Sequence, residues 1–181
     1  PAWTAAATRP QPRAEAMPTA ITYERSFFAA YTVYKDRIAE KRMRVFSHGT
    51  TQHGMQARSE KLQHMPLGYH HPAGPVGDIY SQIPHERVAV AGLGVGAMAA
   101  YAEEGKEFVF FEIDPLVEKM AREHFTYLDR CGKRCEVQIG DARKKLREAK
   151  PHSFDIIMMD AYNSDSVPTH LLTTEALELY L

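Results

Sequence analysis

The sequence predicts an α/β fold, in which a doubly wound parallel sheet with right-handed crossovers follows a small antiparallel β lobe. Two observations predict the parallel sheet: strand-like segments alternate with helical ones after residue 87, and the buried apolar runs end in glycines or acids. A third predicts the lobe, because residues 21–56 contain short segments rich in β-branched and aromatic residues.

The length and composition are those of a globular chain. The 181 residues are 44% hydrophobic and 25% charged, which is enough to build a core and excludes a disordered chain. With 22 Lys and Arg against 23 Asp and Glu, the net charge is −1, so we expect no nucleic-acid partner. Apolar runs such as Phe108 to Phe111 are far shorter than the ~20 residues of a bilayer span, so we expect no membrane segment.

Cysteine usage predicts a reducing, cytoplasmic environment. Cys131 and Cys135 are too few for the disulfide framework of a small secreted scaffold, and no signal-peptide pattern opens the given sequence. Their spacing is one residue longer than C-x-x-C, and no second pair is present. We therefore expect structural thiols.

The two ends of the sequence differ from the part between them. Residues 1–20 form an Ala, Pro, Thr and Arg tract with few apolar residues, which predicts a flexible tail or linker. Thr173 to Leu181 begins like an amphipathic helix but has no Gly or Asn cap at its end. We expect a fragment of a longer protein, in which later strands of the sheet are missing.

Residues 21–84 are predicted to form the β lobe and the loop that connects it to the sheet. Pro and Gly residues recur from Gln63 to Pro84 and predict a segment without regular elements. The strand-like segments of the lobe are Ile21 to Phe28, Tyr31 to Tyr34 and Met43 to Ser47.

Residues 85–181 are predicted to form the parallel sheet, with its ligand beyond the carboxyl ends of the strands. The expected strands are Val88 to Ala91, Glu107 to Phe111, Cys135 to Ile139 and Phe154 to Met159. The expected helices are Ala97 to Glu104, Leu116 to Phe125 and Ala142 to Ala149. Gly92 to Gly96, Glu112, Asp141 and Asp160 follow the strands, so polar and flexible residues meet at one edge.

Gly92, Gly94 and Gly96 form G-x-G-x-G between a strand and a helix, where backbone N–H groups can approach a ligand. Glu112 follows the first glycine by 112 − 92 = 20 residues, the spacing at which a carboxylate accepts hydrogen bonds from two ribose hydroxyls. The two features together predict a nucleoside site. Ala97 fits the last place of a dinucleotide motif, so NAD stays open, and the simpler alternative is a tight turn beside a solvated acid.

Two further acids follow strands. Asp141 opens a helix, where it caps the N-terminus or, with a nucleoside bound, accepts the exocyclic amine of adenine. Asp160 ends a strongly apolar strand beside Tyr162 and near Asp165, which suits a general base that deprotonates a nucleophile. The alternative for Asp160 is a strand-end acid that accepts hydrogen bonds from loop N–H groups.

Histidines gather in His48 to Gln56 and in Tyr69-His70-His71. Neither segment has the Cys, His and carboxylate spacing of a usual metal site. We therefore expect no metal.

Several of these segments together resemble the spermidine synthase (polyamine aminopropyltransferase) family. The resemblance covers about residues 23–181 and is closest to the spermidine-synthase-like domains found fused to membrane transporter segments. Its most specific part is Asp160 to Thr173. The other segments are His48 to Gln52, Tyr69-His70, Gly92 to Gly96, Glu112 to Pro115, Gly140 to Ala142 and Phe154 to Asp160.

The resemblance implies a Rossmann-like, class I methyltransferase-type sheet behind the β lobe. It also implies transfer of an aminopropyl group from decarboxylated S-adenosylmethionine to an amine such as putrescine, and a homodimer. Carried over by position, Glu112 would hold the ribose and Asp141 the adenine amine, with the glycines at the nucleoside's flank and Asp160 as the base. Gln52, Tyr69 and His70 would line the cofactor and amine pocket, and Tyr162 and Asp165 would adjoin the amine.

Four positions depart from the family pattern and remove carboxylates that would surround cationic substrates. They are His48, His71, Val95 and Asn163. Val95 favours a methyltransferase that uses S-adenosylmethionine, and the missing carboxylates favour a non-catalytic nucleoside-binding domain, such as a cytoplasmic domain of a larger membrane protein. An NAD-dependent reductase is the remaining alternative.

Overall fold

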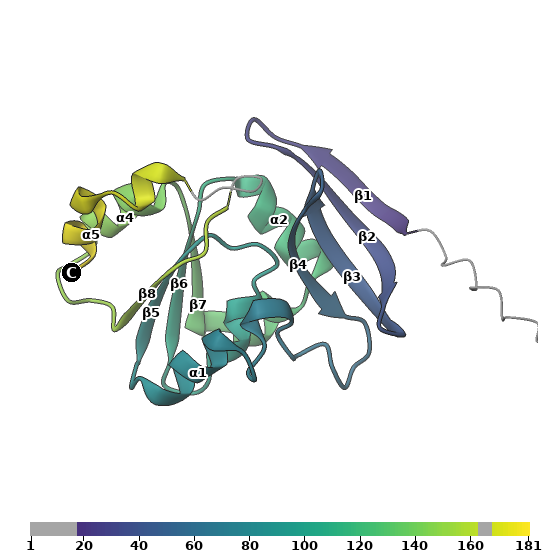
Figure 1. Ribbon diagram of the computed structural model, residues 1–181, viewed down its shortest axis with the longest axis horizontal. Coiled ribbons are helices and arrows are strands. Elements are labelled where there is room, and N and C mark those ends of the chain that lie inside the picture. Colours follow the sequence, from purple (N-terminus) through teal and green to yellow (C-terminus); the bar gives the residue numbers. More distant parts are fainter. Residues whose placement is uncertain (1–17, 163–167) are drawn as a thin grey trace, which may run out of the picture.

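The computed structural model describes residues 18–162 and 168–181, which form two four-stranded sheets (Figure 1). The first sheet is antiparallel, in the order β1 (Thr19–Arg25), β2 (Ala30–Ile38), β3 (Lys41–His48) and β4 (Thr51–Ala57). The second is parallel, in the order β7 (Cys135–Ile139), β6 (Glu107–Glu112), β5 (Arg87–Ala91) and β8 (Ile156–Met159). The predicted fold class, a β lobe before a parallel α/β sheet, is confirmed.

Helices connect and cover the parallel strands. The α-helices are α1 (Pro75–Gln82), α2 (Pro115–His124), α3 (Tyr127–Cys131), α4 (Ala142–Glu148) and α5 (Thr174–Tyr180). Short 3-10 turns lie at η1 (Gly68–His70), η2 (Ala97–Tyr101), η3 (Gly132–Arg134) and η4 (Thr169–Leu171). Side-chain oxygens of Asp114, Asp141 and Thr173 accept hydrogen bonds at the N-termini of α2, α4 and α5, as N-cap residues do.

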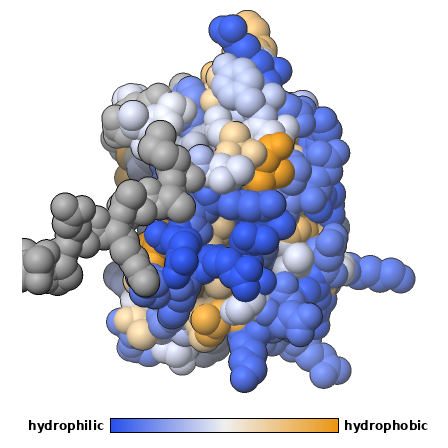
Figure 2. Space-filling view, turned by 90° about the vertical axis from the view of Figure 1, so that its right-hand side faces the viewer, coloured by the Kyte–Doolittle hydropathy of each residue, from blue (hydrophilic) through white to orange (hydrophobic). Residues whose placement is uncertain are grey.

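Alternating residues of the central strands face two different cores. Val88 and Val90 of β5 join the larger core together with Tyr31 and Phe46 of the antiparallel sheet. Ala89 and its neighbours on the other face join a smaller core with α4. The antiparallel sheet and α2 therefore lie on one side of the parallel sheet, and α4 and α5 lie on the other (Figure 1). The outer surface on the side of the antiparallel sheet is mostly hydrophilic (Figure 2).

The two sheets meet at glycines. Gly94 has a φ of +53°, and a Cβ there would lie 2.6 Å from the carbonyl oxygen of His53 in β4. Opposite it, a Cβ on Gly54 would lie 2.6 Å from the side chain of Val95. Only residues without a side chain allow this approach, so the glycines hold β4 against the loop that follows β5.

Three predictions about the elements were wrong. Residues 63–84 contain α1, because Pro75 stands at its first turn, where proline is tolerated. The helix expected over residues 97–104 is only the 3-10 turn η2, because the glycine loop and the turn at Gly105 use the rest of this connection. β1 begins at Thr19, inside the predicted tail of residues 1–20, and residues 1–17 lie outside the described part.

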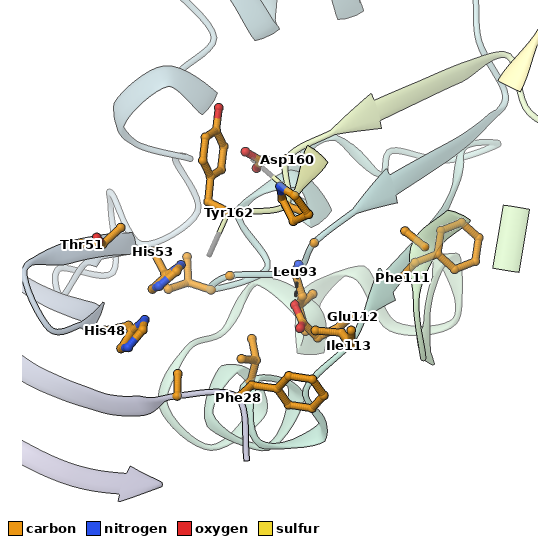
Figure 3. A pocket seen from close by; sticks show the side chains of 18 of the residues that line it. Phe28, His48, Thr51, His53, Leu93, Phe111, Glu112, Ile113, Asp160 and Tyr162 are labelled. Carbon is orange, nitrogen blue, oxygen red and sulfur yellow. Dashed lines mark hydrogen bonds between the residues drawn. The ribbon is translucent and has the colours of Figure 1, made fainter. Parts of the chain in front are cut away.

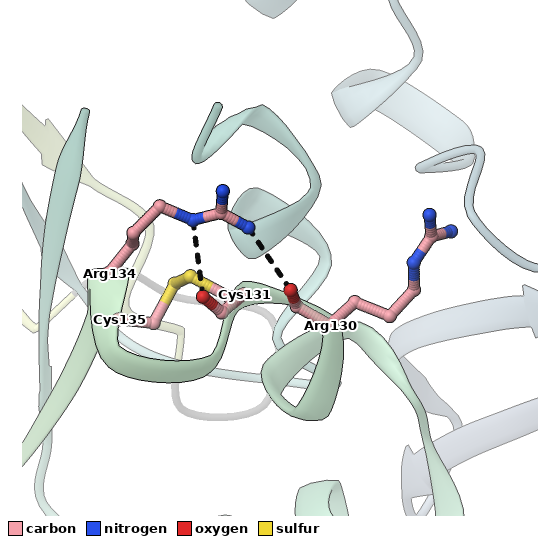
Figure 4. The surroundings of a disulfide bond; sticks show 4 residues. All are labelled: Arg130, Cys131, Arg134 and Cys135. Atoms are coloured by element: carbon pink, nitrogen blue, oxygen red, sulfur yellow. Dashed lines mark hydrogen bonds between the residues drawn. A yellow bond between two sulfur atoms is a disulfide. The ribbon is translucent and has the colours of Figure 1, made fainter. Parts of the chain in front are cut away.

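The expectation of structural thiols at Cys131 and Cys135, in a reducing environment, was also wrong. The two residues form a disulfide, and Arg134 donates hydrogen bonds to the carbonyl oxygens of Arg130 and Cys131 beside it (Figure 4). The turn η3 brings the two Cα atoms to 5.7 Å, within the range that a disulfide needs. Because disulfides are rare in reducing compartments, the cysteines no longer support the expected cytoplasmic environment.

Of the helices in the described residues, none combines the length and the apolar character that a membrane span requires.

The glycine contact between the sheets gives a stability prediction. Gly94→Ala should lower the free energy of unfolding by about 2–4 kcal/mol, because left-handed strain adds to a backbone clash. Gly49→Ala is the matched control, since Gly49 has a φ of +56° and a Cβ added there would meet no atom within 4 Å. The control should lose only about 1–2 kcal/mol in urea unfolding. Equal losses for the two variants would show that the contact is unimportant.

Candidate active site

A cavity of about 560 Å³ lies between the carboxyl edge of the parallel sheet and the antiparallel sheet (Figure 3). This volume suits a small-molecule ligand. The predicted site residues that line the cavity are Gln52, Tyr69, His70, Gly92, Gly94, Glu112, Asp141, Asp160 and Tyr162. Gly96 does not line it, and Asp165 lies outside the described residues.

Glu112 is the buried acid of the cavity, with 7% of its surface exposed. Its two carboxylate oxygens accept hydrogen bonds from the backbone N–H groups of Leu93, at 3.0 Å, and Asp114, at 2.9 Å. Burial raises the pKa of Glu112, and these hydrogen bonds oppose that rise. The carboxylate is thereby fixed in one orientation beside the glycine loop, and each oxygen keeps a lone pair for a ligand.

Asp141 has a structural role and a second polar partner. One oxygen caps α4 by accepting the N–H of Lys144 at 2.9 Å, and the other lies 2.8 Å from Nε2 of His170. Partial burial works against ionisation, but these two hydrogen bonds outweigh it and hold the pKa of Asp141 below its usual range. The N-cap interpretation is confirmed, and the same carboxylate still faces the cavity.

Asp160 follows β8 and is held by two neighbours from η1. The hydroxyl of Tyr69 donates to Oδ1 at 2.8 Å, and Nε2 of His70 lies 2.9 Å from Oδ2. Burial and the nearby carboxylate raise the pKa of Tyr69, so its phenol stays neutral and donates. Tyr101 donates to the carbonyl oxygen of His70 at 2.6 Å and so fixes this segment. Residues far apart in the sequence thus orient one carboxylate.

The glycines have close neighbours within the protein itself. A Cβ on Gly92, where φ is +98°, would lie 2.5 Å from the carbonyl oxygen of Asp160, and a Cβ on Gly96 would lie 3.2 Å from Leu128. Gly92 therefore lets β5 and β8 approach each other at their carboxyl ends. Gly96, which faces α3, was predicted at the ligand site but packs behind it.

The sequence indicated only part of the wall that the antiparallel sheet contributes: Gln52 was predicted at the pocket and His48 was noted as a departure from the family pattern, but His53 and Phe28 were missed. His48 and His53 lie across the cavity from Glu112 and Asp160 (Figure 3), and Phe28 also lines the cavity. The rings of His48 and His53 stack, with their centroids 6.1 Å apart. His48 ends β3 and His53 lies in β4, on the two sides of the hairpin turn at Gly49. This position on one hairpin was a signal that the two rings could line the same wall.

His170 was also missed as a site residue. It belongs to the segment Asp160 to Thr173, the most specific part of the resemblance, and it contacts Asp141. Within residues 18–162 and 168–181, no group of three or more His, Cys, Asp or Glu side chains is arranged to hold a metal ion.

Comparisons with known proteins identify proteins that are similar in sequence and in fold. No family model matches the chain. A polyamine aminopropyltransferase of Vibrio vulnificus (strain CMCP6) is 35% identical over 99 residues, which cover 51% of this chain and 32% of the relative. The chain thus spans about a third of the length of this curated relative.

Solved structures of spermidine synthases have a similar fold. One, in complex with the transition state analogue AdoDATO, has a TM-score of 0.65 at 20% identity, covering 89% of this chain and 53% of that one. A probable spermidine synthase from Corynebacterium glutamicum ATCC 13032 has a TM-score of 0.67 at 17% identity, covering 87% and 58%. The chain resembles the spermidine synthase family in sequence and in fold.

Three of the four positions that depart from the family pattern lie within the described residues. Val95 is buried against Gly54 and lines the cavity, and His48 lies on the opposite sheet at the cavity wall. His71 accepts a hydrogen bond from the N–H of Ala73 at 3.0 Å and does not line the cavity. Asn163 lies outside the described residues.

The contact between Asp141 and His170 gives a prediction for the acid. His170→Ala should raise the pKa of Asp141 toward the ordinary aspartate value, because the carboxylate loses a hydrogen-bond donor. With its lowered pKa, Asp141 stabilises the fold above the unfolded-state pKa, and this stabilisation is lost as the pH falls through the folded-state pKa. Carboxyl carbon NMR measures the shift. Arg147→Ala on the same helix is the control, and an unchanged Asp141 titration in His170→Ala would contradict the assignment.

Proposed function

We propose that this chain carries the nucleoside and reaction site of a spermidine-synthase-like transferase, which moves an aminopropyl group from decarboxylated S-adenosylmethionine to an amine. One observation carries the proposal: three carboxylates at successive strand ends, Glu112, Asp141 and Asp160, line the same cavity as the glycine loop. The aminopropyltransferase relative supports it. In this proposal, residues 21–84 form the lobe that covers the site and residues 85–181 bind the nucleoside.

Glu112 and Asp141 provide the nucleoside contacts in this proposal. The backbone N–H groups of Leu93 and Asp114 occupy one lone pair on each oxygen of Glu112, which leaves acceptors for the two ribose hydroxyls. Asp141 lies farther along the same edge, where it accepts the exocyclic amine of adenine. Its oxygen Oδ2 already contacts His170, so that side chain borders the base.

Asp160 is the base in this proposal. An alkylamine with a pKa of about 10 is mostly protonated at neutral pH and must lose a proton before it attacks. Among the described residues, Oδ1 and Oδ2 of Asp160 each have one partner, which leaves a lone pair on either oxygen for that proton in this proposal. The amine nitrogen then forms a bond to the carbon next to the sulfonium, that carbon–sulfur bond breaks, and the thioether nucleoside leaves. Tyr69 and His70 orient the carboxylate for this transfer.

The alternatives differ in what they require of Asp160. A methyltransferase is not favoured, because the curated relative is named as a polyamine aminopropyltransferase. A non-catalytic nucleoside-binding domain would bind the nucleoside without turnover. The Asp160 variant below distinguishes it from the proposed enzyme.

Removing the base should abolish transfer while nucleoside binding persists. Asp160→Asn should lower the rate of transfer by about 10²- to 10⁴-fold, because general-base catalysis contributes that much. The affinity for 5′-methylthioadenosine should stay within about twofold of that of the unsubstituted chain, because in this proposal Glu112 holds the ribose and Asp160 does not. Release of this product, followed by mass spectrometry with decarboxylated S-adenosylmethionine and a panel of amines, measures the rate. Asp155→Asn, at the opposite end of β8, is the control.

Full transfer by Asp160→Asn would exclude its role as base. Nucleoside binding by the unmodified chain without transfer to any amine would instead favour the non-catalytic domain.

Removing the ribose contact should weaken nucleoside binding. Glu112→Gln should raise the dissociation constant for 5′-methylthioadenosine by about 10- to 100-fold, because the amide replaces one of two charged acceptors. Glu107→Gln, at the start of the same strand, should leave it unchanged, because Glu107 is exposed at the opposite edge. Isothermal titration measures both. Equal affinity in the two variants would show that Glu112 does not bind the ribose.

A further inference from the structure

The large apolar side chains that stay exposed in the cavity fall into two groups. Between 44% and 54% of the surface is exposed in each of the described cavity residues Phe28, Tyr69, Ile113 and Tyr162. Tyr162 lies beside Asp160 (Figure 3), and Tyr69 donates a hydrogen bond to the same carboxylate. Phe28 and Ile113 instead lie at the Glu112 end of the cavity (Figure 3). Exposed apolar surface inside a cavity is surface that a ligand can cover.

Hydrogen bonds tie Phe28 to the acid that holds the ribose in the proposed function. The hydroxyl of Ser26 accepts the backbone N–H of Phe28 at 3.0 Å and donates to Oδ2 of Asp114. The backbone N–H of Asp114 in turn donates to Oε1 of Glu112 at 2.9 Å. The β1–β2 connection, residues 26–29, is therefore fixed at the same end of the cavity as Glu112, although the two are far apart in the sequence.

The base of a nucleoside passes Ile113 in the proposed function. The backbone N–H of Gly140 donates to the carbonyl oxygen of Glu112 at 2.8 Å, so the loop that carries Asp141 lies next to the end of β6. A base that reaches from a ribose on Glu112 to Asp141 crosses the exposed side chain of Ile113. The reactive end of the donor points the other way, toward the proposed base of the reaction. The apolar faces of the adenine therefore lie at the end of the cavity that the β1–β2 connection borders.

From these contacts we infer that Phe28 is a nucleoside-binding residue, whose ring packs against the adenine of the donor together with Ile113. An aromatic ring stacks on a flat π-system and removes a large apolar area from water. The inference rests on the proposed function and adds the part of the donor that the β lobe recognises, an aromatic base. Phe28 takes no part in the proton transfer, because it lies at the other end of the cavity from Asp160 (Figure 3).

Phe27 supplies a matched control on the same connection. Its side chain is 96% exposed and does not line the cavity. Its ring contacts that of Phe28 edge-on, with the centroids 5.4 Å apart. The two residues have the same side chain and are neighbours in one turn, but only Phe28 faces the cavity. A general effect of removing a ring from this turn would therefore appear in both variants.

Calorimetry with 5′-methylthioadenosine tests the inference without turnover. Phe28→Ala should raise the dissociation constant by about 5- to 50-fold, because the base loses its aromatic partner. Phe27→Ala should stay within about twofold of the unsubstituted chain, and Phe28→Tyr, which keeps the ring, within about threefold. Unchanged affinity in Phe28→Ala, or equal losses in Phe28→Ala and Phe27→Ala, overturns the inference. A loss in Phe28→Tyr as large as that in Phe28→Ala overturns the role of the ring.

Nuclear Overhauser effects locate the contact in the unsubstituted chain, which also covers the case in which Phe28→Ala fails to fold. With 5′-methylthioadenosine at saturation, the ring protons of Phe28 should show effects to H2 or H8 of the adenine. Phe28→Tyr identifies the signals of this ring. Effects only to the ribose or methylthio protons, or none at all, overturn the inference.

The transfer reaction separates this inference from the proposed function. With decarboxylated S-adenosylmethionine and an amine, Phe28→Ala should raise the KM for the donor and leave kcat and the KM for the amine within about twofold. A lower kcat with an unchanged KM for the donor overturns the inference and leaves the proposed function intact. Nucleoside binding with the expected contacts but no transfer to any amine supports the inference and overturns the proposed transfer. If the unsubstituted chain binds no nucleoside, both proposals fail.

Discussion

The close approach of β4 to the loop after β5 is the contact on which the cavity depends. Gly94 lies against the carbonyl oxygen of His53, and Gly54 lies against Val95, so neither chain segment can move away without opening the core that the two sheets share. This contact places the histidine wall opposite the strand-end carboxylates. Without it, the parallel sheet would present the same acids to open solvent, where hydrogen bonds to a ligand are worth less.

The acids of the site are oriented before any ligand binds. Backbone N–H groups hold Glu112, the helix cap and His170 hold Asp141, and Tyr69 and His70 hold Asp160. Such preorganisation lowers the entropy that binding must lose and fixes the directions of the remaining lone pairs. In the proposed function, these three carboxylates have different tasks because each has a different set of partners.

Local patterns in the sequence predicted the strands and the carboxylates well. β7 has the predicted bounds, Cys135 to Ile139, and Glu112, Asp141 and Asp160 all reach the cavity, because parallel strands end at one edge of a sheet. The patterns failed where the outcome depends on contacts between distant segments. The wall containing His53 depends on how the lobe packs, and Pro75 begins a helix in a stretch that its composition marks as a loop.

The cysteine pair shows the same limit, because the turn between the two residues sets the distance between them, and the number of cysteines does not.

Both proposals require an adenosine moiety along the carboxyl edge of the parallel sheet. A crystal structure of the chain with 5′-methylthioadenosine tests this requirement most directly. We expect both ribose hydroxyls on Glu112, the adenine beside Asp141 and the sulfur facing Asp160. A nucleoside bound elsewhere, or a cavity without nucleoside at a saturating concentration, would contradict it.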